Sequence, residues 1–346
     1  MYSLRNLSLP AKGFFNRVSI RSVSSQPHYD GTQSSLAQNS AAYLGDALST
    51  DIPSVDLSYD KHSPTKGAGD SDKSPVIIAH GLFGSKTNTR TVAKQLADKL
   101  SRDIFCIDLR NFGQSPHMNR LDYPSLASDV EEFVKKQNFV NKPILVGHSM
   151  GAKTVLAVAL RSPELPKMVV SVDNAPVDAR SASGSVFSRY IRQLRIATEQ
   201  FKYTNIKDVD AKLAEVEPNV VVRQFLLTNM NRGKKDEPVT SKIPLDIIGK
   251  AIDAGNIASW PYDSNLNRWS KGPALFIRGT ESTYVPDDVL PEIGKYFPDF
   301  EVRDVECGHW VISEKPTEFI DILSEFIERK EEEEEFELGG DRNIFK

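Results

Sequence analysis

The sequence predicts a doubly wound α/β domain, in which a mostly parallel sheet has helices on both faces and a helical cap inserted between two strands. Short, fully apolar runs alternate along the chain with stretches whose apolar residues recur at helical spacing. Such alternation is typical of buried parallel strands joined by right-handed helical crossovers. It lapses once, between about residues 177 and 265, and resumes at residue 273.

The apolar runs predict six strands, and the stretches between them predict five helices. Strands are expected over residues 75–80, 104–108, 143–147, 168–173, 273–278 and 300–305. Helices are expected over residues 87–100, around 126–134, over 150–161, around 287–296, and from Pro316 to about 329. An alternation of Val55, Leu57 and Tyr59 also indicates a short edge strand before the first of these elements.

The region 177–265 carries apolar residues at mostly helical spacing, with no strand of period two and no internal repeat. An insertion of this size between two strands most simply forms a cap over their carboxyl ends. An independent second domain is the weaker alternative, because the sheet pattern resumes afterwards. We therefore expect one α/β domain over residues 74–330 that includes the cap.

Both ends of the chain lie outside that domain. The first 29 residues contain four basic residues and no acid, mixed with serines and apolar residues. This is the signature of a mitochondrial transit peptide, expected over residues 1–25, with a disordered basic tail as the alternative. Residues 26–73 are rich in Ser, Asp, Gly and Pro and are expected to be flexible. Residues 331–346 form an acidic tail in which Glu331 to Glu335 should stay solvated.

Composition excludes several functional classes. The 346 residues are 39% hydrophobic and 26% charged, the balance of a globular protein rather than a fibrous or disordered one. No run reaches the about 18 apolar residues of a membrane-spanning helix. Two cysteines make neither a disulfide framework nor a metal site, and none of the six histidines has zinc-site spacing, so no metal is expected. The net charge of −4 argues against a general nucleic-acid binder.

The sequence Gly147-His148-Ser149-Met150-Gly151 fits the G-x-S-x-G nucleophile elbow. It follows a predicted buried strand and opens a predicted helix, which is the context that the motif requires. In such a tight turn the Ser149 hydroxyl projects at a helix N-terminus, where developing negative charge is favoured. The alternative is a glycine-rich turn without chemical importance. Ser149 is the candidate nucleophile.

A serine nucleophile needs a base and, behind it, an acid. His309 lies in the loop between the last strand and the last helix, and the order Ser, acid, His is the one expected for this motif. His80 and His148 flank glycines and could also reach the site. The acid stays open on spacing alone: Asp173 ends the fourth strand, and Glu281 follows the strand 273–278.

The sequence His80-Gly81-Leu82-Phe83-Gly84 follows the first apolar strand. It resembles the loop that supplies one backbone N–H to an oxyanion hole, with Leu82 as the expected donor. Met150, the residue after the nucleophile, would supply the second N–H. The alternative is an ordinary strand–helix loop.

Three stretches together carry a family resemblance: residues 80–88, residues 108–117 and residues 147–153. They resemble the abhydrolase domain-containing protein eleven family of the alpha/beta-hydrolase superfamily, which includes the yeast mitochondrial alcohol (ethanol) acetyltransferases. The resemblance spans about residues 75–329. It implies the alpha/beta-hydrolase fold, a cap, a mitochondrial location and a Ser-His-Asp triad. The family's acid stands in a D-x-x-P-V setting, which here favours Asp173. The histidine at position 148 of the elbow resembles the elbow residue of the hydrolase members of the family. Some ethanol-acetylating relatives instead carry tyrosine and leucine in the elbow.

The resemblance implies an alcohol acetyltransferase that makes acetate esters from acetyl-CoA, with esterase and thioesterase side activity. The alternative is a hydrolase of short acyl esters in the mitochondrial matrix, and a third possibility is a non-catalytic partner protein on the same fold. No cofactor is expected apart from acetyl-CoA as a co-substrate. The expected partners are small esters or thioesters and alcohols, and the sequence does not predict an oligomeric state.

Overall fold

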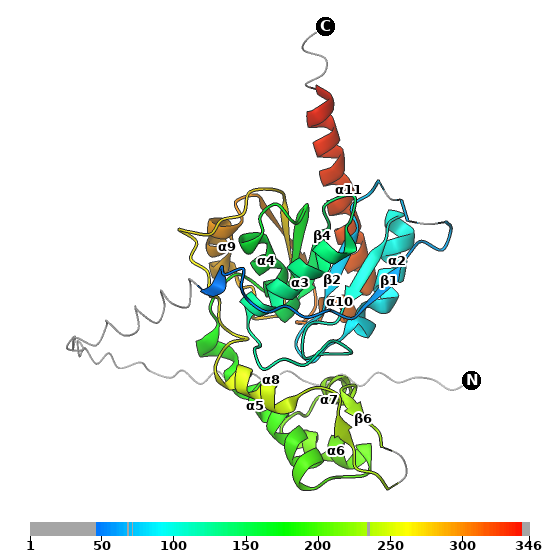
Figure 1. Ribbon diagram of the computed structural model, residues 1–346, viewed down its shortest axis with the longest axis vertical. Helices are drawn as coiled ribbons and strands as arrows, with labels where there is room; N and C mark the ends of the chain where they lie inside the picture. The colour runs from blue at the N-terminus through cyan, green and yellow to red at the C-terminus, as the bar shows by residue number, and fades with distance from the viewer. Residues whose placement is uncertain (1–45, 68, 71, 234–235, 341–346) are drawn as a thin grey trace, which may run out of the picture. The chain divides into compact units, whose positions relative to one another are not determined.

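The computed structural model describes residues 46–340, except residues 68, 71, 234 and 235. The predicted transit peptide, residues 26–45 of the predicted flexible segment and residues 341–346 of the predicted tail lie outside the described residues. The described chain forms a seven-stranded sheet in the order β1-β3-β2-β4-β5-β8-β9 (Figure 1). Its strands are β1 (Tyr59–His62), β2 (Val76–Ala79), β3 (Ile104–Ile107), β4 (Ile144–His148), β5 (Met168–Val172), β8 (Ala274–Gly279) and β9 (Phe300–Val305).

All neighbouring strands are parallel except β1 and β3, which are antiparallel. The predicted fold class is therefore confirmed. The β2, β3 and β5 residues are all buried, because helices cover both faces of the sheet and leave no polar side. These strands could be predicted from the sequence because burial on both faces gives continuous apolar runs.

Alternate side chains along each strand enter one of two apolar layers. Ile77 and Leu145 pack in the layer that contains α3 and α4, whereas Ile78 and Val146 pack with α2 and α11. The helices that cover the two faces are α2 (Arg90–Leu100), α3 (Tyr123–Gln137), α4 (Met150–Arg161), α9 (Leu290–Tyr296), α10 (Val311–Glu314) and α11 (Pro316–Gly340). Short 3₁₀ turns, η1 (Lys86–Thr89) and η3 (Asp287–Val289), precede α2 and α9.

The insertion lies between β5 and β8 and is mainly helical. It consists of α5 (Arg180–Arg195), a π-helical turn η2 (Ile196–Gln200), α6 (Ile206–Ala214), α7 (Val220–Leu227), β6 (Met230–Asn231), β7 (Thr240–Ser241) and α8 (Leu245–Asp253). β6 and β7 pair in antiparallel fashion, a short strand pair that the sequence did not indicate. Two-residue strands are too short to show a period of two. We call this insertion the cap.

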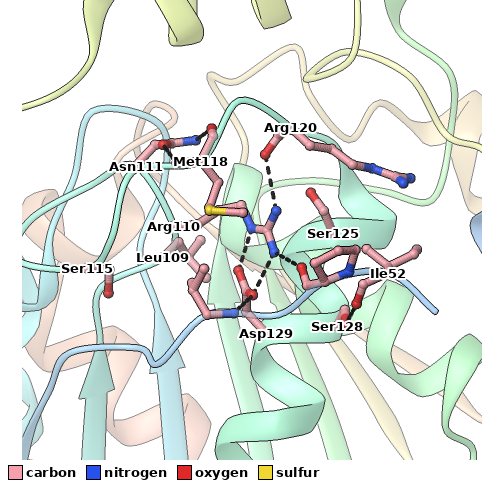
Figure 2. Close-up of polar contacts among 12 residues, drawn as sticks. Ile52, Leu109, Arg110, Asn111, Ser115, Met118, Arg120, Ser125, Ser128 and Asp129 are labelled. Atoms are coloured by element: carbon pink, nitrogen blue, oxygen red, sulfur yellow. Dashed lines mark hydrogen bonds and ion pairs between the residues drawn. The ribbon is translucent and has the colours of Figure 1, made fainter. Parts of the chain in front are cut away.

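The expectation that residues 26–73 are flexible is wrong for residues 46–58, which we call the strap. The buried carboxylate of Asp129 accepts a hydrogen bond from the backbone N–H of Val55, and Arg110 donates to the Pro53 carbonyl. Ser128 donates to the Ile52 carbonyl (Figure 2). Buried polar side chains of the domain thus hold the strap by its backbone groups. The polar composition of the strap does not reveal these contacts. The edge strand follows it as β1, later in the chain than the alternation of Val55, Leu57 and Tyr59 indicated.

The predicted last helix continues past residue 329 to Gly340, so the acidic run is helical rather than a separate tail (Figure 1). Glu331 forms an ion pair with Arg102 at 2.7 Å, and the Arg102 side chain is only 1% exposed. Burial opposes ionisation of Glu331, but the hydrogen bonds from Arg102 leave the pKa of Glu331 below its ordinary value. The expectation that Glu331 is solvated is therefore wrong.

Candidate active site

Ser149 occupies a strained turn between β4 and α4. Its backbone has φ of 55° and ψ of −115°, a conformation that a residue with a side chain rarely adopts. The turn is possible because its two glycines allow close backbone contact. A Cβ on Gly147 would lie 2.1 Å from the Gly151 carbonyl oxygen, and one on Gly151 would lie 2.3 Å from the Ala79 carbonyl oxygen. The G-x-S-x-G spacing therefore reflects steric necessity.

The structure brings Ser149, His309 and Asp173 together in one hydrogen-bonded chain. His309 Nε2 lies 2.9 Å from Ser149 Oγ, and His309 Nδ1 lies 2.6 Å from Asp173 Oδ2. Because an ionised carboxylate only accepts hydrogen bonds, Nδ1 carries a proton and the neutral ring presents Nε2 as an acceptor to the serine hydroxyl. This is the arrangement in which an imidazole removes a proton from serine.

Asp173 is fully buried and its geometry distinguishes it from Glu281. The backbone N–H of Gly279 donates to Asp173 Oδ1 at 3.0 Å, and the Ser282 hydroxyl donates to Oδ2 at 2.5 Å. The Glu281 side chain is exposed, and its backbone N–H donates to the Cys307 carbonyl. Of the two candidate acids, the structure therefore places Asp173 on the imidazole.

Two residues at this site carry no sequence signal. Ser282 holds the carboxylate of Asp173 as described above. The ring of Tyr284 stacks on the His309 imidazole, with centroids 3.9 Å apart and an interplanar angle of 17°. Both lie in the loop after β8, where a serine and a tyrosine are unremarkable in composition. Only the folded loop shows that they support the acid and the imidazole.

His80 and His148, the other two candidate bases, are occupied by backbone groups. His148 Nε2 donates to the His309 carbonyl at 2.8 Å, and burial lowers the pKa of His148 to about 4, so the ring is neutral. His80 Nε2 accepts from the Leu109 N–H, which leaves Nδ1 to donate to the Gly81 carbonyl. Burial also lowers the pKa of His80. These two rings hold loops in place around Ser149.

Leu82 and Met150, the predicted oxyanion donors, both lie beside Ser149 in the wall of one cavity. Met150 is the first residue of α4, so its N–H has no acceptor within the helix. Leu82 lies in a tight turn in which the Gly84 N–H donates to the Gly81 carbonyl at 2.9 Å. Both residues thus line the same cavity as the serine.

Two cavities meet at Ser149. The hinge cavity, of about 360 Å³, includes Tyr123, Lys153, Val177, Ala258 and Tyr284 in its wall. The histidine cavity, of about 260 Å³, includes His148, Phe225, His309 and Trp310. Leu82, Ser149 and Phe187 line both. Most of the exposed wall in each cavity is apolar, which suits small apolar groups on either side of a reacting carbonyl.

Neither a metal centre nor a membrane-spanning element is found in the part of the chain that the structure describes. Within those residues, no three His, Cys, Asp or Glu side chains are grouped so that they could hold a metal ion. The same residues include no helix with the length and apolar character needed to cross a membrane.

The family described as "alpha/beta hydrolase fold" matches residues 74–316. The chain belongs to this family. The chain is 42% identical to "Probable alcohol acetyltransferase" of Saccharomyces cerevisiae over 294 residues, an alignment that covers 80% of this chain and 85% of that protein. It is 32% identical over 278 residues to "sn-1-specific diacylglycerol lipase ABHD11" of Xenopus laevis, which covers 79% of this chain and 84% of that protein.

Among solved structures, the chain is similar to "Marine microorganism esterase" with a TM-score of 0.69 and 32% identity. The match covers 79% of this chain and all of that one. These comparisons confirm the resemblance to the abhydrolase and alcohol acetyltransferase group. The chain is therefore an enzyme of the serine hydrolase and acyltransferase type.

Proposed function

We propose that the enzyme transfers acyl groups through a covalent acyl-enzyme on Ser149 and that an alcohol is the physiological acceptor. The proposed reaction makes acetate esters from acetyl-CoA as co-substrate, with esterase and thioesterase side activity. The observation that carries the proposal is the hydrogen-bonded chain from Asp173 through His309 to Ser149. The acetyltransferase name of the 42% identical yeast relative supports the choice of acceptor.

In the first half-reaction, His309 Nε2 takes the proton of Ser149 while Oγ forms a bond to the substrate carbonyl carbon. Asp173 stabilises the imidazolium that results, and the N–H groups of Leu82 and Met150 are the proposed donors to the oxyanion. The carbonyl then re-forms as the bond to the leaving thiol or alcohol breaks, and the leaving group takes the proton from His309. The acyl group remains on Ser149.

In the second half-reaction, an alcohol gives its proton to His309 Nε2 and attacks the acyl carbon. The Ser149 bond breaks and the serine recovers the proton. Water that takes the place of the alcohol gives hydrolysis by the same steps. The partition between the two products depends on how well the site excludes water and positions the alcohol.

The residues that line the two cavities support a proposal for where the two parts of an ester bind. His309 must reach both the leaving group and the incoming alcohol, and it lines the histidine cavity with Ser149. His309 is not one of the described residues that line the hinge cavity. The alcohol or thiol portion therefore belongs in the histidine cavity and the acyl chain in the hinge cavity.

The competing proposal is a hydrolase of short acyl esters, supported by the esterase among the similar structures. To separate the two, purified enzyme is incubated with acetyl-CoA and alcohols of increasing length, and ester is measured against free acetate. Ester that increases with alcohol concentration is expected. Free acetate alone at every alcohol concentration would refute the transferase proposal.

A fluorophosphonate probe tests whether the protein is catalytic at all. Wild-type enzyme should be labelled at Ser149, and Ser149→Ala should be unlabelled and inactive while remaining folded. Absence of labelling in the wild type would favour the non-catalytic partner protein instead.

We also propose a mitochondrial location, supported by the four basic residues and the absence of acids in the first 29 residues. Residues 1–45 fused to a fluorescent protein should direct it to mitochondria. Replacement of Arg5, Lys12, Arg17 and Arg21 by glutamine should leave it in the cytosol. Cytosolic fluorescence of the unaltered fusion would contradict this proposal.

A further inference from the structure

Lys153 is a buried lysine on α4, one helical turn after Ser149, and the proposed mechanism does not use it. Its side chain is 1% exposed. Its ammonium donates hydrogen bonds to three backbone carbonyls: Val177 at 2.7 Å, Ala258 at 3.1 Å and Ser259 at 3.2 Å. A lysine is almost never buried to this degree unless its charge is satisfied, and here carbonyl oxygens satisfy it.

The three carbonyls belong to the two ends of the cap. Val177 lies between β5 and α5, where the chain enters the cap, and Ala258 and Ser259 follow α8, where it leaves. The two ends also bind each other, because the Ala179 N–H donates to the Ala258 carbonyl at 2.9 Å. Lys153 therefore connects both ends of the cap to the helix that carries the nucleophile.

Tyr123, the first residue of α3, reinforces this connection. The Lys153 ammonium lies 5.4 Å from the centre of the Tyr123 ring, and the Tyr123 hydroxyl donates to the Ile257 carbonyl at 2.6 Å. An ammonium over an aromatic face is attracted to it. The exit of the cap is thus attached to both α3 and α4, and the entry is attached to α4.

The anchored segments form part of the hinge cavity. Val177, Ala179, Ile257 and Ala258 line it together with Lys153. A liquid water molecule occupies about 30 Å³, and a methylene group is of similar size, so a cavity of this volume holds far more than an acetyl group. Apolar side chains provide most of its surface, which is the environment that an alkyl chain requires.

We propose that Lys153 is a positioning residue that fixes the wall of the hinge cavity by binding both ends of the cap, and that this cavity admits acyl chains longer than acetyl. The proposal rests on the proposed function, because it takes the hinge cavity as the place of the acyl group. It names the substrate class as esters or thioesters with medium-length acyl chains in addition to acetyl.

The number of anchoring bonds depends on the charge of Lys153. An ammonium has three N–H donors for the three carbonyls, whereas a neutral amine has two donors and a lone pair, so one carbonyl loses its partner. Burial lowers the pKa of Lys153 to about 7, and the Asp178 carboxylate in the same entry segment partly opposes this shift. Tyr123 faces the ammonium from α3. The anchor should therefore be complete below pH 7 and weaker above it.

The test compares p-nitrophenyl octanoate with p-nitrophenyl acetate in wild-type enzyme, Lys153→Met and Lys153→Gln. Lys153→Met should lower the preference for octanoate over acetate about tenfold, the effect of losing a hydrogen bond to a charged group, mainly through KM for octanoate. In the wild type, KM for octanoate should rise as the pH passes from 6 to 9. In both variants KM should not change over this range. Lys250→Met, which alters an exposed lysine on α8, is the matched control and should behave as the wild type.

Fluorophosphonate labelling separates the two proposals. A wild type that neither reacts with the probe nor cleaves either ester refutes the proposed function itself. If Ser149 is labelled in all variants but the octanoate preference is unchanged in Lys153→Met, the role of Lys153 is refuted. Should Lys153→Met fail to fold, Lys153→Gln decides, since it keeps two N–H donors. A KM that still rises with pH in that variant overturns the proposal.

Discussion

Asp173 and Asp129 are both fully buried carboxylates that hydrogen-bond to a basic side chain. Their basic partners differ in what the nitrogens not bound to the carboxylate contact. Asp129 binds Arg110 through Nε at 2.5 Å and Nη2 at 2.7 Å, and the other Arg110 contacts are to the carbonyls of Arg120 and Pro53 (Figure 2). Asp173 binds only one nitrogen of His309, and the second nitrogen faces Ser149.

The comparison shows why burial alone does not make an active site. A guanidinium stays charged at every accessible pH, and here Nη2 also donates to the Pro53 carbonyl of the strap while Nη1 donates to the Arg120 carbonyl. An imidazole changes charge near neutral pH and has a second nitrogen to exchange a proton with a neighbour. The first pair is therefore suited to stabilising the fold and the second to catalysis, although both place an acid and a base at hydrogen-bond distance in the same domain.

The largest expected effect comes from Asp173→Asn. Asparagine keeps the shape of the side chain but can no longer fix the tautomer of His309 or stabilise the imidazolium, so kcat should fall by about four orders of magnitude. Glu281→Gln is the matched control, because that side chain is exposed, and it should change kcat less than twofold. Steady-state kinetics on an acetate ester measure both. Equal losses in the two variants would show that the acid is assigned wrongly.

The reverse is expected for Asp129→Asn, which should affect stability and leave the activity of the folded enzyme intact. Removal of one partner leaves the charge of Arg110 buried and uncompensated, which should lower the free energy of unfolding by about 3–5 kcal/mol. Asp56→Asn, which alters an exposed strap carboxylate bound to Lys136, should cost less than about 1 kcal/mol. Urea denaturation gives the stabilities. A stable but inactive Asp129→Asn enzyme would remove the distinction between the two pairs.

The pair of Arg102 and Glu331 extends the comparison to the end of α11. Glu331→Gln should lower the free energy of unfolding at pH 7 by about 2 kcal/mol, because Arg102 is buried and loses an ionised partner. The pKa of Glu331 is lowered in the folded protein, so its stabilisation is complete above the unfolded pKa of about 4.3 and is lost as the pH falls further. The difference between variant and wild type should thus vanish in acid. Glu334→Gln, at a more exposed acid, should remain close to the wild type at both pH values.

The sequence was sufficient wherever function depends on local pattern, and insufficient where it depends on how loops meet. The apolar runs predicted the strands because both faces of the sheet are covered. The two elbow glycines predicted Ser149 because a side chain at either glycine position would collide with the backbone. Asp173 and Glu281 could not be separated by spacing, because β5 and β8 are neighbours that end at the same edge of the sheet. The left-handed backbone at Asp173, with φ of 52°, is known only from the fold.

The residues that the sequence did not reveal share one property, which is that they act through backbone groups or through another side chain. Lys153 binds carbonyls, and a carbonyl is present at every residue, so no composition or spacing indicates its partners. The same holds for the strap, whose backbone is held by Arg110, Ser128 and Asp129. Tyr284 acts through the ring of His309, from a loop that is distant in sequence.

The smallest effect is expected for Tyr284→Leu. This substitution measures how much the surroundings of His309, beyond its hydrogen bonds, contribute to kcat. The Tyr284 ring covers one face of the imidazole, and an aromatic face stabilises the cation that forms in each half-reaction. Its loss should lower kcat about fivefold, the equivalent of about 1 kcal/mol. Tyr284→Phe keeps the ring and should stay within twofold of the wild type. If both variants lost activity equally, the Tyr284 hydroxyl rather than the stacked ring would be responsible. If neither lost activity, the hydrogen bonds to Asp173 and Ser149 would alone account for the behaviour of His309.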